Sequence, residues 1–255
     1  MSLDIASDFD QFVDPSPRLA SRIYHQHSKL SPYKFLQFQE QVIAYNQQHE
    51  RAQQQIAGKS YPTRLKVGLP APSRRLGKRR LSDVLSTRRT RRGAFSPHPV
   101  SLRQWGHLLG AACGITGQAT HSQDPTLVEP LRAWPSAGSL YPIEVYLAPL
   151  SSCELDQAWH HYDVGDHQLS ITGKCCERSA LEELIYAEGL WDNVSGVLVL
   201  TASFEKTQVK YGERGYRFVL LDAGHLAQNI LLVCEDLGLA AIPLGGFDDD
   251  GLANE

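Results

Sequence analysis

The chain has 255 residues, of which 42% are hydrophobic and 21% charged, so it is long enough to bury a sizeable core. Its formal net charge of −3 lacks the basic excess of nucleic-acid-binding proteins and argues against that class. No apolar run approaches the length of a membrane span, and the acidic start is unlike a signal sequence. The five cysteines have no CxxC spacing, and their odd number favours a reducing compartment, so we predict a cytoplasmic protein.

The first 75 residues are mostly polar and predict an N-terminal extension. Residues 39–55 carry no sustained apolar stripe, which indicates a solvated helix or an arm that covers a partner. Residues 66–80 are rich in proline, glycine and basic residues, as is typical of a linker. We therefore assign residues 1–75 to the extension and residues 76–255 to one folded domain.

Apolar spacing predicts three helices beyond residue 80. The first starts at Leu81 and puts Leu81 and Val84 on one face, and the second is capped by Ser101 and ends at Gly114. The longest, over residues 216–239, is apolar on both sides. We expect a helix of this kind to be buried in a domain core or at a dimer interface.

Strands are predicted over residues 143–149 and 195–204, and the second is apolar enough to be central and buried. Residues 159–163 and 168–172 are predicted to pair as a hairpin. A short strand over residues 240–243 is expected to lead into a glycine pair. With helices and strands in this order, the sequence favours an α+β domain.

A cluster of basic residues follows the first of these helices. Arg88, Arg89, Arg91 and Arg92 stand within five residues, together with Thr90. Guanidinium groups this close repel one another, so the cluster favours a phosphate or carboxylate ligand, which a planar guanidinium binds with two parallel hydrogen bonds. Taken alone, such a run is more typical of a solvated turn.

Two loops are built from small or stiff residues. Residues 135–142 read PSAGSLYP, in which small side chains let backbone N–H groups approach a flat ligand and two prolines stiffen the chain. An ordinary turn does not need eight such residues, so a binding role is favoured. Residues 242–246 read IPLGG and expose backbone amides in the same way, although a plain turn is equally compatible there.

These three segments, in this order, resemble the nitroreductase superfamily, whose members hold FMN at a homodimer interface. More narrowly, the chain is similar to SagB-type dehydrogenases, which include the azoline oxidases of thiazole- and oxazole-modified peptide pathways. The more specific motifs are KYGERGYRF at residues 210–218, AGHLAQN at 223–229 and GGFDDD at 245–250. Residues 24–29 also fit the region that precedes the domain in this subfamily.

The resemblance covers residues 81 to 255 and implies a nitroreductase-like FMN-binding fold. We expect a central mixed or antiparallel sheet flanked by helices, with the N-terminal extension ahead of it. The family normally continues past a further helix and strand to a segment that crosses to the other subunit and helps to hold the phosphate. The resemblance therefore implies that the C-terminal end of the domain is missing and that the FMN site is weakened.

The resemblance also implies the residues of a flavin site. The FMN phosphate, ribityl chain and pyrimidine edge would be bound by Arg88, Arg89, Thr90 and Arg92. The ring near N5 would be lined by Pro135, Ser136, Ala137, Gly138 and Ser139, and its other side by Pro243, Leu244, Gly245 and Gly246. Donors near N1 and N5 stabilise the reduced flavin and set its hydride acceptance.

Lys210 and Tyr211 match the Lys–Tyr pair of the azoline oxidases and are the catalytic candidates. The reaction needs a base for the ring α-proton, and a lysine serves only where burial or a nearby cation lowers its pKa. Arg214 and Arg217 are close enough in sequence to supply that cation. Without the resemblance, a surface lysine at a strand end and a packed tyrosine would be the simpler interpretation.

Other candidates are interpreted as structural. His225 and Gln228 are three residues apart on the long helix and share a face, so we expect His225 to support the site rather than to catalyse. The ten histidines show no ligand spacing of the HExxH kind, and no metal site is expected. The acidic residues 248–250 are predicted to cap the next helix.

Three functions remain open. The first is FMN-dependent oxidation of thiazoline or oxazoline rings in a ribosomal peptide, which the KYGERGYRF motif favours. The second is a general nitro- or quinone-reducing flavoprotein that takes electrons from NAD(P)H. The third is a catalytically idle scaffold subunit of a peptide-modifying complex, which the polar N-terminal arm and the chain end favour.

Overall fold

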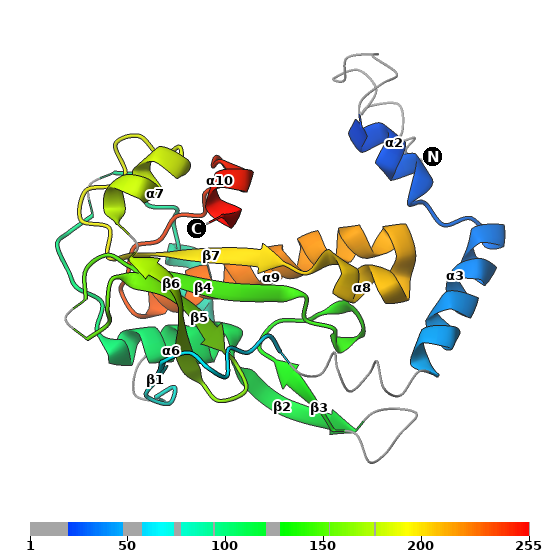
Figure 1. The fold of residues 1–255 in the computed structure, drawn as a ribbon, viewed down its shortest axis with the longest axis horizontal. Coiled ribbons are helices and arrows are strands. Elements are labelled where there is room, and N and C mark those ends of the chain that lie inside the picture. The colour runs from blue at the N-terminus through cyan, green and yellow to red at the C-terminus, as the bar shows by residue number, and fades with distance from the viewer. Residues whose placement is uncertain are drawn as a thin grey trace.

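The computed structural model describes residues 20–47, 58–73, 78–93, 95–120, 128–152, 154–175 and 177–254. A five-stranded antiparallel sheet lies at its centre, with the strand order β1-β6-β5-β4-β7 (Figure 1). Its strands are β1 (Lys66–Gly68), β4 (Ile143–Pro149), β5 (Ala158–Asp163), β6 (Gln168–Cys175) and β7 (Gly196–Ala202). A separate two-stranded ribbon pairs β2 (Ile115–Thr120) with β3 (Val128–Arg132). The predicted α+β class with a central antiparallel sheet is confirmed.

Helices flank the sheet and extend beyond it. The described helices are α2 (Ala20–His27), α3 (Pro32–Asn46), α5 (Leu81–Thr87), α6 (Leu102–Cys113), α7 (Arg178–Leu184), α8 (Phe204–Tyr211), α9 (Gly215–Asp236) and α10 (Asp249–Ala253). The short helix at residue 81, the Ser101 cap and the helix end at Gly114 are confirmed. Asp248 caps α10 by accepting a hydrogen bond from the Gly251 amide at 3.0 Å, also as expected.

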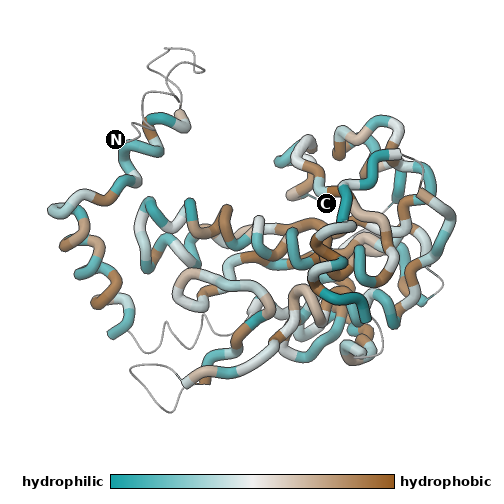
Figure 2. The backbone as a smooth tube through the Cα atoms, turned by 180° about the vertical axis from the view of Figure 1, so that it is seen from behind, coloured by the Kyte–Doolittle hydropathy of each residue, from teal (hydrophilic) through white to brown (hydrophobic). Residues whose placement is uncertain are grey.

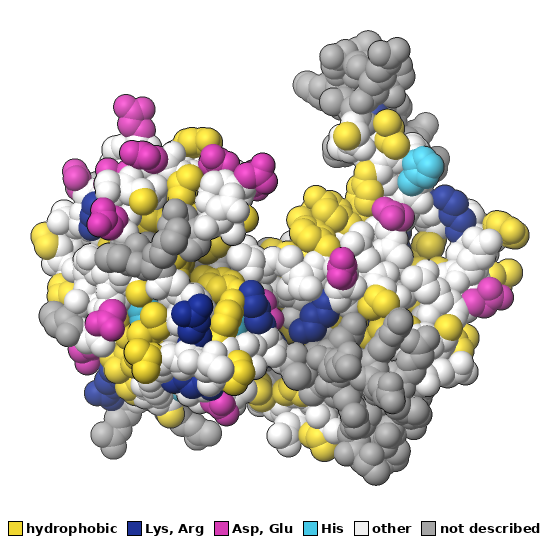
Figure 3. Space-filling model, in the orientation of Figure 1, with side chains coloured by type: hydrophobic (Ala, Val, Ile, Leu, Met, Phe, Trp, Pro, Cys, Tyr) yellow, Lys and Arg dark blue, Asp and Glu magenta, His cyan; other side chains and the backbone are white. Residues whose placement is uncertain are grey.

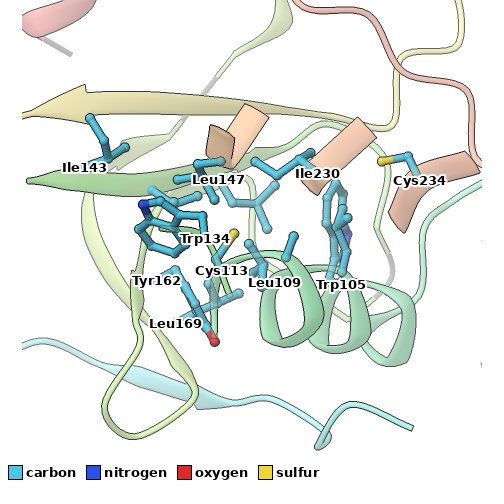
Figure 4. Packing of buried hydrophobic residues seen from close by; sticks show 14 of the residues in the cluster. Trp105, Leu109, Cys113, Trp134, Ile143, Leu147, Tyr162, Leu169, Ile230 and Cys234 are labelled. Carbon is cyan, nitrogen blue, oxygen red and sulfur yellow. The ribbon is translucent and has the colours of Figure 1, made fainter. Parts of the chain in front are cut away.

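The core is divided by the sheet into two layers. Ile143, Val145 and Leu147 of β4 point into one cluster with residues of α6 and α9, whereas Ala148 belongs to a second cluster with Leu181 of α7. This division follows from the alternation of side chains along a strand. Figure 4 shows the larger cluster, in which Trp105 and Leu109 of α6 lie below Leu147 of β4 and Ile230 and Cys234 of α9.

Three strand and linker predictions need correction. The apolar strand predicted to be central is β7, which stands at the edge of the sheet and is half-buried. Residues 240–243 form no strand, and the nearest pairing is a single bridge between Ile185 and Phe247. Part of the predicted linker, Lys66–Gly68, pairs with β6 as β1, because its short extended run covers an otherwise open sheet edge.

The run Phe204–Asp236 is long and apolar enough to cross a membrane by length and composition alone. This corrects the prediction that no apolar run approaches that length. Core helices share such a composition, and α9 buries Val219, Leu226 and Ile230 in the larger cluster. Figure 2 shows, from behind, how the hydrophobic positions of this helix run through the molecule.

Candidate functional site

The arginine segment and the glycine pair lie beside each other. Residues 88–92 follow α5 without regular structure, and the Arg91 amide donates to the Ala241 carbonyl at 3.4 Å, just ahead of the glycine pair. The Tyr186 amide donates to the Gly246 carbonyl at 2.9 Å and anchors the pair to the chain after α7. We call residues 88–92 together with 243–246 the basic cluster.

Three guanidinium groups of the basic cluster lack anionic partners within the described residues, whereas the charge of Arg91 acts on Glu235. Arg88, Arg89 and Arg92 form no ion pair there, and Arg89 Nη1 donates only to backbone carbonyls, including one at 2.9 Å. The nearby carboxylate of Glu235 is occupied by Arg79 at 2.8 Å. Exposed and unneutralised arginines are suited to a phosphate ligand.

The loop of residues 135–139 contacts the predicted catalytic pair. Gly138 has a positive φ of 63°, and a Cβ placed on it would lie 2.5 Å from the Tyr211 hydroxyl and 3.0 Å from Lys210 Nζ. The loop backbone can approach the two side chains this closely only because residue 138 has no side chain. We call residues 135–139 with Lys210 and Tyr211 the Lys–Tyr cluster.

Burial sets the protonation of the pair. Burial lowers the pKa of Lys210, opposed by the negative charge of Glu129 on β3. Burial raises the pKa of Tyr211, and the charge of Asp222 raises it further. A lysine with a lowered pKa beside a protonated tyrosine is the combination that a general base with a proton donor needs.

Asp222 on α9 is a member of the site that sequence reasoning missed. Only 3% of it is exposed, and it is held against the loop by the Ser136 side chain and the Ala137 amide. Burial raises its pKa, while these two contacts and the charge of His225 act in the opposite direction. An acidic residue on the buried face of an apolar helix was the signal that could have identified it.

The contacts of Arg214 and Arg217 and the exposure of His225 differ from expectation. Lys210 and Tyr211 lie in the last turn of α8, and Gly212, with a φ of 56°, ends that helix. Arg214 and Arg217 bind Ser28 instead of lowering the Lys210 pKa. His225 and Gln228 do share a face of α9, but that face is exposed.

The basic cluster and the Lys–Tyr cluster lie towards opposite ends of α9. Asp222 contacts the loop of the Lys–Tyr cluster, whereas Glu235, beside the basic cluster, is thirteen residues further along the helix. At a rise of about 1.5 Å per residue, the two positions are about 20 Å apart. The structure therefore brings the predicted site residues together in two groups, not in one.

A cavity of about 490 Å³ opens at the start of α8, and it was not predicted. It is lined by Gly58, Lys59, Glu144, Thr201, Ala202, Ser203 and Lys206. Lys206 is one helical turn before Lys210, so the two lysines share a face of α8. Within the described residues, no group of histidine, cysteine and acidic side chains is suited to hold a metal ion.

We expect Gly138→Ala to lower both stability and activity. A residue with a side chain costs about 1–2 kcal/mol at this φ, and the added Cβ would displace Tyr211 and Lys210. The melting temperature should fall by about 3–6 °C, which differential scanning calorimetry would measure. Gly68→Ala is the control, because its Cβ meets nothing within 4 Å. Equal melting temperatures for the two variants would contradict the close contact of Gly138 with Tyr211 and Lys210.

Comparison with known proteins identifies related chains. A family model described as the nitroreductase family matches residues 85–255. A protein of Methanocaldococcus jannaschii named as a nitroreductase is 30% identical over 176 residues, covering 67% of this chain and 81% of the relative. The microcin B17-processing protein McbC of Escherichia coli is 34% identical over 142 residues, covering 53% of this chain and 51% of McbC.

Solved structures share the fold. A nitroreductase structure from Anabaena variabilis superposes with a TM-score of 0.59 at 24% identity, covering 84% of this chain and 38% of that chain. The Escherichia coli microcin synthetase McbBCD complex with truncated pro-MccB17 bound gives a TM-score of 0.54 at 24% identity, covering 89% of this chain and 91% of that chain. This chain thus spans about half of McbC and well under half of the Anabaena protein.

Proposed function

Because this chain belongs to the nitroreductase family, we propose that it is a SagB-type, FMN-dependent dehydrogenase that oxidises thiazoline or oxazoline rings in a ribosomal peptide. The observation that carries the proposal is the contact of the Gly138 loop with Lys210 and Tyr211. It joins the loop expected near the flavin ring to the pair expected to move the proton. We also place the protein in the cytoplasm.

The similarity to McbC supports a peptide substrate, since that relative is named for processing microcin B17. The McbBCD structure, to which the fold is similar, is a complex with a bound precursor peptide. We therefore extend the proposal to partner subunits that would present the peptide to this chain. A general nitro- or quinone reductase fed by NAD(P)H is the second candidate, favoured by the nitroreductase of Methanocaldococcus jannaschii.

The residue types in the basic cluster and the Lys–Tyr cluster are suited to binding FMN. The guanidinium groups of Arg88, Arg89 and Arg92, which form no ion pair with the described residues, would hold its phosphate and ribityl chain together with the Thr90 hydroxyl. The open backbone of residues 243–246 would flank the ring, because a Cβ on Gly245 meets no atom within 4 Å. The loop of residues 135–139 would lie along the ring on the side of the catalytic pair.

The chain's own residues supply the proton transfer. The Lys210 amine, kept neutral more readily because burial lowers its pKa, removes the α-proton of the azoline ring. Tyr211, kept protonated by burial, hydrogen-bonds or relays a proton at the ring. Bound FMN would accept the hydride that leaves the neighbouring ring carbon, so that the ring gains a double bond.

A second copy of the chain would bring the clusters together. Leu220 and Leu221 on the open side of α9 are 53% and 56% exposed, next to Gly224. Two such helices packed antiparallel, with the twofold axis beside the exposed Gln228 midway between Asp222 and Glu235, would place the basic cluster of one chain beside the Lys–Tyr cluster of the other. We propose a homodimer in which each flavin site is shared between two chains.

Leu221→Asp is expected to separate the dimer. An unpaired carboxylate buried at the interface costs about 3 kcal/mol or more, which corresponds to a factor of ~100 or more in the dissociation constant. Analytical ultracentrifugation over a concentration series would measure it, together with flavin content. Leu65→Asp, at another exposed leucine, is the control. A dimer that is equally stable with Asp at position 221 would rule out this face.

The proposed function is tested by the visible spectrum and by turnover. The purified protein, supplied with FMN, should show a flavin spectrum that bleaches anaerobically when a thiazoline-containing peptide is added. Bleaching by NAD(P)H with no response to the peptide would favour the general reductase. A protein that takes up no FMN would refute both enzymes and favour the scaffold role.

A further inference from the structure

The N-terminal helix α3 lies over the Lys–Tyr cluster, and α2 contacts residues that follow the pair. We call the described residues 20–47 the arm. Figure 1 shows the arm at the end of the molecule where α8 and α9 meet, and Figure 3 shows hydrophobic side chains on it and on the adjoining body. We propose that the arm is a wall of the active site, with Tyr45 and Phe38 as positioning residues for Lys210 and Tyr211. This proposal rests on the proposed function.

Helix α3 contacts both members of the pair. The Phe38 ring stacks on the Tyr211 ring at a centroid distance of 5.9 Å and an interplanar angle of 21°. Lys210 Nζ lies 5.1 Å from the centroid of the Tyr45 ring, within the range of a cation–π contact. Gln41 Nε2 donates to the Val209 carbonyl at 3.4 Å, which ties the same helix face to the last turn of α8.

The buried position of α3 is one of the residues that make these contacts. Tyr45 is 7% exposed, although most of α3 is open to solvent, including Tyr33 at 72%. A single buried aromatic residue on an otherwise exposed helix marks the position at which the helix packs against the body of the protein. That position is the one above Lys210, so the arm closes the space around the amine rather than simply resting on the body.

Helix α2 and Ser28, the residue after it, bind the charged residues that follow the pair. Arg217 donates from Nη2 and Nε to the Ser28 hydroxyl at 2.7 and 2.9 Å, and Arg214 Nη1 donates to the Ser28 carbonyl at 3.0 Å. Tyr24 meets Tyr216 edge to face at 5.1 Å. The charged and aromatic residues of the KYGERGYRF motif therefore hold the arm, which accounts for their unusual density in the sequence.

The arm affects the proton chemistry by removing water from Lys210. Among the described residues, the charged and titratable groups around the amine are Glu129 from β3, Tyr45 from α3, and Tyr211 and Lys206 from α8, with Asp222 of α9 facing Tyr211. Glu129 favours the charged lysine, so the lowered pKa depends on burial. Truncating Tyr45 would admit water and return the Lys210 pKa towards its ordinary value.

The test measures Lys210 directly, so that it does not depend on turnover. Pulse acetylation with acetic anhydride across a pH series, read at Lys210 by mass spectrometry, gives the pKa of the amine. With Tyr45→Ala we expect that pKa to rise by about one unit, because losing burial outweighs losing the weak cation–π contact. Tyr45→Phe keeps the ring and should match the wild type, as should Tyr33→Ala on the exposed side of α3.

The same variants separate the two proposals. Where the protein oxidises the peptide, the acid limb of its pH–rate profile should move upward with Tyr45→Ala alone. An unchanged Lys210 pKa in Tyr45→Ala, or faster turnover than the wild type, would overturn the role of the arm. A shifted pKa in a protein that never oxidises the peptide would leave the arm contact intact and refute the proposed function.

Discussion

Lys210→Met is expected to reduce oxidation of a thiazoline-containing peptide by about 10²–10⁴-fold, the usual contribution of a general base. Methionine keeps much of the side-chain length and packing but has no amine to remove the ring α-proton. Flavin content should stay at the wild-type level, because the phosphate-binding residues lie in the basic cluster. Mass spectrometry of the peptide would follow the loss of hydrogen as each ring becomes aromatic.

The matched control is Lys66→Met, which removes an exposed lysine of β1 at the far edge of the sheet. It should turn over at the wild-type rate. A Lys210→Met protein that still oxidised the peptide at that rate would assign the base to another group. Loss of flavin together with activity would instead indicate that Lys210 holds the cofactor.

Local patterns predicted the elements whose determinants lie within a few residues. Helix α6 follows from the Ser101 cap and apolar spacing, and its structure shows the reciprocal bond between the Ser101 amide and Gln104 Oε1 at 3.1 Å. The hairpin of β5 and β6 follows from two strands joined by a short polar turn. These predictions succeeded because the relevant hydrogen bonds and side chains are close in sequence.

Long-range pairing limited the strand predictions. An apolar run such as residues 196–202 indicates burial but does not fix a place in the sheet, and within the part of the chain that the structure describes β7 pairs only with β4. Residues 240–243 have β propensity yet find no neighbouring strand among the described residues. Lys66–Gly68 looked like a linker because three residues are too few to show a periodic pattern.

The candidate site could also be predicted only in part, because its assembly depends on contacts between residues far apart in the sequence. The resemblance named the members of both clusters, and the Gly138 loop does meet Lys210 and Tyr211. It did not show that α9 holds the two clusters about 20 Å apart, since that depends on which helix turns each loop contacts. Nor did a polar N-terminal segment reveal Tyr45 above the amine, because one buried aromatic ring in a solvated helix leaves no periodic signal.

The shared site makes a prediction that separates it from a site within one chain. Arg88→Ala/Arg89→Ala, which removes two phosphate ligands, and Lys210→Met should each be inactive as homodimers. Co-expressed with different tags and purified as mixed dimers, the two variants should regain about half of the wild-type turnover per dimer. One of the two sites then combines the intact basic cluster of one chain with the intact Lys–Tyr cluster of the other.

The expected recovery of activity follows from how the two sets of substitutions are distributed between the two sites of the mixed dimer. In a shared site, both substitutions fall in the same site of the mixed dimer, so that the opposite site is undamaged. If each chain held its own complete site, every site would carry one of the two defects and the mixed dimer would remain inactive. Turnover is the deciding readout, because the Lys210→Met chain keeps its basic cluster and a mixed dimer therefore binds one FMN in either case. Mixed dimers as inactive as their parents would refute the shared site.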